Sequence, residues 1–199
     1  MKNEDVKQGH ISAWTKLASR EEYSGRIFSI HRERSRSPRD GREHEFDLLQ
    51  SPDWVNVVAV TPAGNLVLIR QYRHGTTEIT TEIPGGMVDA GEDPLQAARR
   101  ELAEETGYVA EAWEELGRVE PNPAFMDNVT YTYLARGARA AGQQHLDENE
   151  EIEVFEHPLS NVWGLVRDGS IKHALVICAL FHLVLHGDLT LPREVGNVR

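Results

Sequence analysis

The sequence has little cysteine, no long apolar run and no excess of basic side chains, and each shortage excludes a class of protein. Cys178 is the only cysteine, so a disulfide framework and a zinc site with two thiolates are impossible. No stretch reaches the roughly 18 apolar residues of a membrane-spanning helix, and residues 1–7 lack the apolar core of a secretory signal. The formal net charge of -11 opposes binding to nucleic acid or anionic lipid. We therefore expect a cytoplasmic protein with no nucleic-acid partner and no membrane association.

The 199 residues, 40% of them hydrophobic, are enough for a soluble domain with a core of its own. Short strand-type runs separated by turn residues predict an antiparallel N-terminal region. Pro94 is typical of the first position of a helix, and Gly107 of the position just past its end. The sequence predicts strands over 26–31, 43–50, 54–60, 65–71, 113–119, 130–135 and 151–156, and helices over 93–106, from about 160, and over 171–186.

The expected helix over 93–106 carries a cluster of carboxylates. Glu101, Glu104 and Glu105 stand at i, i+3 and i+4, which places them on one helical face. Like charges this close repel, and hard oxygen ligands select Mg²⁺, Mn²⁺ or Ca²⁺ over zinc. The cluster therefore indicates a divalent metal site, although three glutamates alone fit an acidic, solvated helix surface as well.

The spacing around these glutamates forms a longer motif. Gly86 is followed after five residues by Glu92, and after seven more by Arg100-Glu101-Leu102; Glu104-Glu105 and Gly107 complete the pattern. This segment resembles the complete Nudix box, with Tyr108 as an aromatic residue where an aliphatic one is commoner. The resemblance implies an α/β (α+β) Nudix fold, with mixed and antiparallel sheets sandwiched between helices. It also implies a catalytic domain over 54–199, preceded by an N-terminal antiparallel β extension over 1–53.

The resemblance implies roles for the residues of the box. Glu101 and Glu105 look like the principal metal ligands, and Glu104 like a further ligand or the holder of a metal-bound water. The backbone carbonyl of Gly85 is another candidate ligand, since paired glycines let main chain approach an ion. Arg100 looks like a member of the catalytic site that pairs with Glu92 and fixes the approach loop to the helix. The expected cofactor is Mg²⁺, for which Mn²⁺ can substitute.

The segments that flank the box are similar to the ADP-ribose pyrophosphatase branch of the Nudix superfamily. Arg73 ends a strand just before the box, and Pro123 lies fifteen residues beyond Tyr108. By this resemblance Arg73 contacts the diphosphate of the substrate. Glu148 is then the general base that deprotonates the attacking water, and Glu150 completes the metal shell. Without the box, Arg73 would be an ordinary surface arginine and residues 144–157 an acidic loop.

The resemblance implies hydrolysis of ADP-ribose or a related nucleoside diphosphate sugar to a nucleoside monophosphate and a sugar phosphate. Trp54 and Phe28 are candidates for stacking on the base, with core packing as the alternative for both. A homodimer is implied as well, because N-terminal strands commonly cross to a second subunit in this branch. The competing interpretations are a pyrophosphatase acting on dinucleoside polyphosphates, coenzyme A or GDP-mannose, and a non-catalytic module that senses ADP-ribose.

Overall fold

The computed structural model describes residues 11–192, and the chain divides into two units by its internal contacts. The first unit consists of Met1–Ser51 with Asn122–Asp127, and the second of Pro52–Pro121 with Asn128–Arg199. None of the helices within residues 11–192 is both long and apolar enough to cross a membrane.

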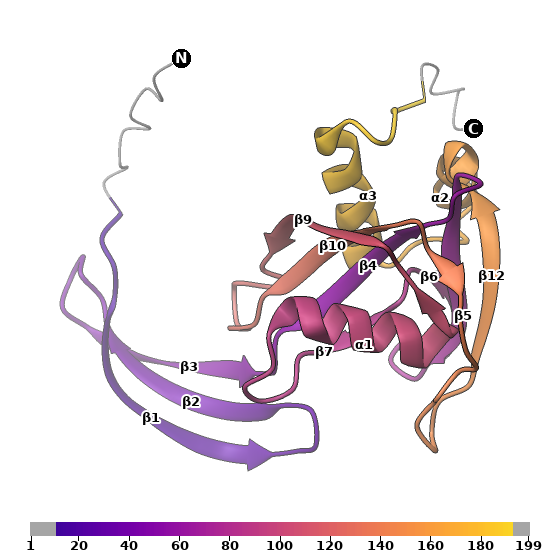
Figure 1. The fold of residues 1–199 in the computed structure, drawn as a ribbon. Helices are drawn as coiled ribbons and strands as arrows, with labels where there is room; N and C mark the ends of the chain where they lie inside the picture. Colours follow the sequence, from indigo (N-terminus) through magenta and orange to yellow (C-terminus); the bar gives the residue numbers. More distant parts are fainter. Residues whose placement is uncertain (1–10, 193–199) are drawn as a thin grey trace. The chain divides into compact units, whose positions relative to one another are not determined.

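The first unit is built on an antiparallel sheet in the order β1-β2-β3 (Figure 1). Its strands are β1 (Thr15–Ser24), β2 (Ser29–Arg36) and β3 (Glu43–Gln50). The turn between β2 and β3 contains Gly41 at a φ of 72°, a conformation that glycine adopts without strain. Residues 122–127 join this unit through the backbone N–H of Leu49, which donates to the carbonyl oxygen of Phe125 at 2.7 Å.

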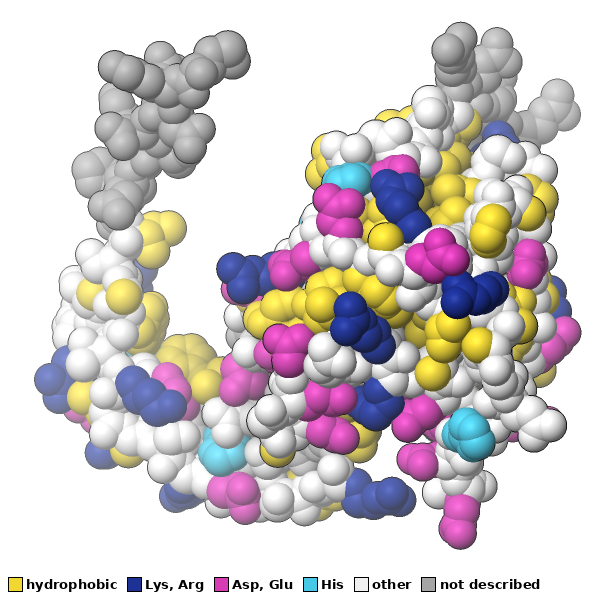
Figure 2. Space-filling model, in the orientation of Figure 1, with side chains coloured by type: hydrophobic (Ala, Val, Ile, Leu, Met, Phe, Trp, Pro, Cys, Tyr) yellow, Lys and Arg dark blue, Asp and Glu magenta, His cyan; other side chains and the backbone are white. Residues whose placement is uncertain are grey.

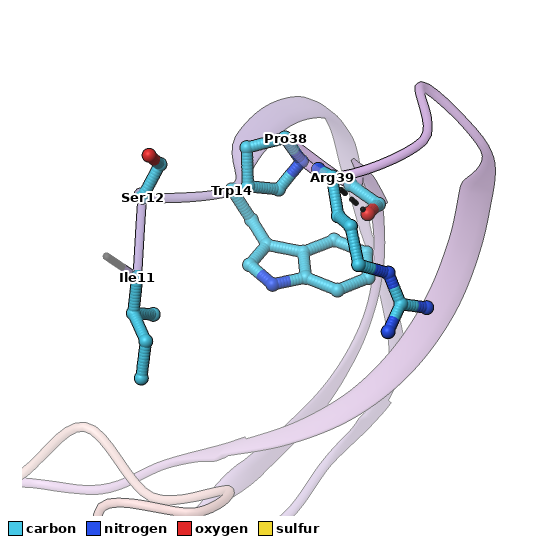
Figure 3. Close-up of a pocket in the computed structure, with 6 residues that line it drawn as sticks. Ile11, Ser12, Trp14, Pro38 and Arg39 are labelled. Carbon is cyan, nitrogen blue, oxygen red and sulfur yellow. Dashed lines mark hydrogen bonds between the residues drawn. The ribbon is translucent and has the colours of Figure 1, made fainter. Parts of the chain in front are cut away.

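The first unit buries very little apolar surface. In its described part, 11–51 and 122–127, no hydrophobic side chain is buried, and the buried residues are Ser35 and Ser37. A pocket at one end of the sheet is lined by Trp14, Pro38 and Arg39 among others, and Figure 3 shows the Trp14 indole between the side chains of Ile11 and Arg39. The large hydrophobic side chains left exposed in this unit are Ile11, Trp14, Tyr23, Ile27, Phe46 and Phe125.

The second unit contains a seven-stranded mixed sheet with the main order β12-β5-β4-β10-β9. Strands β4 and β10 run parallel, with Trp54 opposite Thr130, whereas the other pairs are antiparallel. Strand β6 pairs with β5, and β7 pairs with β4. The elements are β4 (Trp54–Val60), β5 (Asn65–Arg73), β6 (Glu78–Glu82), β7 (Gly85–Met87), α1 (Pro94–Thr106), β8 (Tyr108–Val109), β9 (Ala112–Val119), β10 (Thr130–Arg136), β11 (Arg139–Ala140), β12 (Ile152–Pro158), a 3₁₀ turn (Leu159–Asn161), α2 (Val162–Arg167) and α3 (Ala174–His186).

Two apolar cores lie on opposite faces of this sheet. Alternate side chains of β4 enter different cores, because successive residues of a strand point to opposite faces: Val57 packs with Leu102 of α1, and Val58 with Leu180 of α3. Figure 1 shows α1 on one side of the sheet and α3 on the other. The expected fold, with sheets sandwiched between helices, is confirmed.

The ends of α1 are set by local chemistry. The Oδ1 atom of Asp93 accepts hydrogen bonds from the backbone N–H groups of Leu95 (3.0 Å) and Gln96 (3.3 Å), and Pro94 occupies the first helical position. Gly107 ends the helix in the left-handed conformation, at a φ of 71°. The helix expected over 93–106 is therefore confirmed.

Elsewhere the structure departs from the sequence-based expectations. Strand β1 was not expected, because its sequence has no regular alternation of apolar and polar residues. In the structure its pairing with β2 contains two register shifts, which interrupt such an alternation. The strand expected over 26–31 forms instead as Ser29–Arg36, after a turn in which the backbone N–H of Gly25 donates to Phe28. The last helix begins at Ala174, three residues after the expected start at 171.

Candidate active site

Arg100 organises the polar face of α1. Its Nη1 atom donates to Glu101 at 2.8 Å and to Glu104 at 3.2 Å, while Nε and Nη2 donate to both carboxylate oxygens of Glu92, at 3.1 and 2.9 Å. Nη2 also donates to the backbone carbonyl of Met87 at 2.9 Å. These bonds raise the pKa of Arg100, Glu92 contributing most. The arginine thereby offsets the repulsion between carboxylates and ties the approach loop to the helix.

Glu105 is buried on the same helical face. Its Oε2 atom accepts a hydrogen bond from the backbone N–H of Gly85 at 2.9 Å. Burial raises the pKa of Glu105 to about 8, and the negative charges of Glu101 and Glu150 act in the same direction. Burial likewise raises the pKa of Glu101. Both carboxyl groups thus lie where a nearby cation would favour their ionised forms.

The glycine pair before the helix lets main chain and carboxylates approach closely. A Cβ atom on Gly85 would lie 2.1 Å from the backbone oxygen of Val55, and one on Gly86 would lie 2.4 Å from the carboxylate of Glu101. Any other residue at these positions would displace β4 or push Glu101 away.

Arg73 is held by a carboxylate that the sequence analysis did not identify. Its Nε and Nη2 atoms donate to the two carboxylate oxygens of Glu82, at 2.8 and 2.7 Å, and Thr80 donates to Glu82 at 2.6 Å. Burial by itself would raise the pKa of Glu82. The hydrogen bonds from Arg73 and Thr80, with the charge of Arg73, outweigh burial and hold that pKa below its ordinary value.

A sequence signal for Glu82 does exist. In the β5–β6 hairpin Gln71 pairs with Thr80 and Ile69 with Glu82, so Arg73, Thr80 and Glu82 share one face. Because side chains two residues apart on a strand share a face, this register places the Glu82 carboxylate on the face of Arg73, once the turn at 74–77 is recognised.

The acidic loop before β12 supplies a further carboxylate to this region. Glu150 closes a turn: its Oε2 atom accepts from the backbone N–H of Asp147 at 3.2 Å, and its own N–H donates to the Asp147 carbonyl at 3.0 Å. The charge of Glu150 contributes to the raised pKa values of Glu101, Glu105 and Arg73. Glu148 is exposed within the same turn. Four charged groups from three separate segments of the chain, Arg73, Glu101 with Glu105, and Glu150, thus influence one another.

The two aromatic candidates for base stacking lie in different units. Trp54 begins β4 in the second unit, is half-buried and pairs with Met87 of β7. Phe28 belongs to the first unit, where its ring packs against Tyr23 with the centroids 6.0 Å apart. Their role in stacking on a base stays a prediction.

The donor set fits a divalent cation by its chemistry. Carboxylate oxygens on one face of α1, with the main chain of Gly85 beside them, are the hard ligands such an ion prefers. Within residues 11–192, however, no three His, Cys, Asp or Glu side chains form a group that could hold a metal ion as they stand. Arg100 holds Glu101, and the Gly85 N–H holds Glu105. Figure 2 shows acidic and basic side chains together on the face that carries α1.

Comparison with known proteins identifies the family. Residues 50–180 match the model of the NUDIX domain. The chain belongs to the NUDIX domain family. Over 170 residues it is 30% identical to the ADP-ribose pyrophosphatase of Bacillus subtilis (strain 168), an alignment that covers 85% of this chain and 91% of that protein. It is also 30% identical to the methanol dehydrogenase activator of Bacillus methanolicus, over 84% of this chain and 90% of that protein.

The fold of this NUDIX chain is shared with a solved structure. The crystal structure of an ADP compounds hydrolase superposes with a TM-score of 0.79 at 23% identity, covering 91% of this chain and all of the other. This NUDIX chain is therefore a hydrolase with the Nudix fold, and hydrolases of this family generally need a divalent metal ion.

The Arg73–Glu82 pair predicts a pH-dependent stability. Because the pKa of Glu82 is lowered on folding, the pair stabilises the protein above about pH 4.5, the ordinary value, and loses this effect as the pH falls through the folded pKa. Glu82→Gln should lower the free energy of unfolding at neutral pH by about 1–2 kcal/mol, less than for a fully buried pair because the Arg73 side chain is 35% exposed. Urea unfolding of both proteins should show this difference shrinking below about pH 4.5.

A matched control is the exposed ion pair between Arg70 and Glu153. Arg70 lies on β5, as Arg73 does, and Glu153 lies on β12. Glu153→Gln should cost less than Glu82→Gln, since exposed pairs contribute little. Equal losses for the two variants, or a Glu82→Gln difference that does not change with pH, would contradict the prediction.

Proposed function

We propose that this protein hydrolyses the diphosphate bond of ADP-ribose or a related nucleoside diphosphate sugar, using Mg²⁺, for which Mn²⁺ can substitute. The products are a nucleoside monophosphate and a sugar phosphate. The similarity to the ADP-ribose pyrophosphatase of Bacillus subtilis supports this substrate class. The single cysteine is compatible with the cytoplasmic location expected from the sequence.

The observation that carries the proposal is the gathering of Arg73 from β5, Glu101 and Glu105 from α1 and Glu150 from the acidic loop, which belong to three separate segments. Arg73 is influenced by the charges of Glu105 and Glu150, and Glu150 acts in turn on Glu101 and Glu105. A diphosphate and its counter-cation need this combination: a cationic donor for phosphoryl oxygens beside oxygen ligands for a metal.

Five positions are assigned to the metal. Glu101 and Glu105 would hold the cation from α1, with Glu104 beside them, the Gly85 carbonyl from β7 and Glu150 from the acidic loop. When bound, a divalent cation neutralises phosphoryl oxygens and lowers the pKa of water. Arg100 keeps Glu101 and Glu104 in place through its hydrogen bonds.

Arg73 and Glu148 are assigned to substrate and water. Glu82 engages Nε and Nη2 of Arg73, so the guanidinium is oriented and Nη1 remains to donate to a phosphoryl oxygen. Glu148 takes a proton from the attacking water. At the same time the water oxygen bonds to phosphorus, and the bond between that phosphorus and the bridging oxygen breaks. Trp54 and Phe28 are assigned to stacking on the base.

The first experiment identifies the products. With Mg²⁺, ADP-ribose should give AMP and ribose 5-phosphate, and orthophosphate should appear only after added phosphatase. Glu101→Gln and Glu105→Gln should each lower turnover by about three powers of ten or more, because a metal ligand is lost without loss of apolar packing. Chromatography of the products across a panel of substrates checks both expectations.

The same panel separates the alternatives. Dinucleoside polyphosphates, coenzyme A or GDP-mannose hydrolysed far faster than ADP-ribose would identify a different pyrophosphatase. Tight binding of ADP-ribose without turnover at saturating Mg²⁺ would identify a sensing module. Direct release of orthophosphate from ADP-ribose would contradict the proposed bond cleavage.

The second experiment distinguishes the two loop glutamates. Glu148→Gln should lower kcat strongly with little change in the Mg²⁺ concentration needed for half-maximal rate, because the amide keeps the shape but cannot accept a proton. Glu150→Gln should instead raise that Mg²⁺ concentration. Rate measured against Mg²⁺ for both variants tests the assignment: the opposite pattern would exchange the two roles, and normal rates in both would place the base elsewhere, for example at Glu104.

We also propose that the protein is a homodimer whose interface includes the N-terminal β region, residues 1–53. A three-stranded sheet is stable only when an apolar face is covered, and the described part of this unit buries no hydrophobic side chain of its own. Trp14 and Phe46 form an exposed edge-to-face pair with their ring centroids 5.3 Å apart. A second copy of the chain would remove such aromatic surface from water.

Sedimentation measurements test the dimer. The wild-type protein should sediment as a dimer at micromolar concentration, and Phe46→Asp should shift it to monomer, because a charge in an apolar interface is costly to desolvate. Leu185→Asp is the matched control, since Leu185 is 83% exposed on α3 in the other unit. A monomeric wild type, or equal dissociation of both variants, would contradict the proposal.

A further inference from the structure

The side chain of Gln144 bonds to backbone carbonyls from two separate elements of the second unit. Its Nε2 atom donates to the backbone carbonyl of Glu105 at 2.6 Å and to that of Ile152 at 3.1 Å. One amide nitrogen thus joins the last turn of α1 to the first residue of β12. We propose that Gln144 is a positioning residue, a clamp that closes the base of the acidic loop 145–151 and sets it against α1.

The clamp uses hydrogen-bond acceptors that the helix leaves open. The last four carbonyl groups of an α-helix have no partner within the helix. In α1 the carbonyl of Ala103 accepts from Gly107 at 2.8 Å, that of Glu104 from the backbone N–H of His145 at 2.8 Å, and that of Glu105 from Gln144. Gln144 therefore contributes to the cap of α1, at the backbone carbonyl of a proposed metal ligand.

The segment before the loop is held to the same helix end. The backbone N–H groups of Ala141 and Gly142 both donate to the carbonyl of Gly107, at 2.9 and 3.1 Å. Contact is close, since a Cβ atom on Gly107 would lie 2.5 Å from the oxygen of Gly142. The second bond of Gln144, to Ile152, then fixes where the chain leaves the loop. Residues 146–151 lie between two ends of the loop that Gln144 holds together.

This arrangement bears on the reaction and rests on the proposed function. The loop carries Glu148, the proposed base, and Glu150, the proposed ligand. A base must lie within about 3 Å of the water it deprotonates, and a misplacement of about 1 Å costs on the order of a hundredfold in rate. Gln144 itself is exposed, so water can replace part of its bonding, and we expect a smaller effect than this limit.

Three substitutions separate the donor from the rest of the side chain. Gln144→Met keeps the length of the side chain but removes the hydrogen-bond donor. Gln144→Glu places a carboxylate, which can only accept, opposite the two backbone carbonyls. Gln144→Lys restores a donor at a helix C-terminus, where a cation is favoured. Gln144→Met should lower kcat about tenfold and leave the KM for ADP-ribose within about twofold, because Arg73 and the side chains of α1 are unchanged. Gln144→Glu should lose at least as much, and Gln144→Lys should retain most of the rate.

Hydrogen–deuterium exchange of the metal-free protein gives a readout independent of activity. Exchange over 145–152 should be about tenfold faster in Gln144→Met, with the strands β4 and β5 unchanged. Gln143→Met makes the same chemical change at the adjacent exposed residue and should match the wild type.

The clamp is excluded if Gln144→Met matches the wild type in exchange, or if Gln143→Met causes the same losses. Faster exchange throughout the second unit would show a general structural role instead. A wild type that hydrolyses no nucleoside diphosphate sugar would contradict the proposed function, and the exchange comparison would still judge the clamp.

Discussion

The placement of Arg100 among four neighbouring acceptors is the constraint on which the rest of the site depends. Three glutamates on one helical face repel one another, and the guanidinium donates to Glu101 and Glu104 while it grips Glu92. The same group reaches the carbonyl of Met87, so the approach loop is fixed by the residue that neutralises the helix face. Gly85 then presents its N–H to Glu105, the most deeply buried of the three carboxylates on this helical face.

The second unit combines elements that are packed into apolar cores with a loop that lies outside them. Two apolar cores on opposite faces of the mixed sheet hold α1 and the β5–β6 hairpin, and with them the box glutamates and the Arg73–Glu82 pair. The acidic loop 145–151 lies outside these cores. The proposed base and the proposed loop ligand are therefore placed by hydrogen bonds to α1 and β12 and not by apolar packing.

The first unit has ordered backbone hydrogen bonds but little apolar burial. Its backbone hydrogen bonds form an ordered sheet, yet its described residues leave aromatic side chains in solvent. Hydrogen bonding alone contributes little net stability, so apolar burial must come from outside the sheet. This shortage of apolar burial is the physical argument for the proposed homodimer.

The sequence by itself determined what depends on neighbours along the chain. Asp93, Pro94 and Gly107 set the ends of α1, and the spacing of Glu101, Glu104 and Glu105 put them on one face, because caps and helical periodicity act within a few residues. Much of the second unit was predictable for the same reason, whereas the position of β2 and the existence of β1 were not. Only the tertiary structure decided that Glu82 orients Arg73, that Glu150 acts on the box carboxylates and that Gln144 joins α1 to β12. These contacts depend on strand register and loop path, which are set by packing between segments distant in sequence.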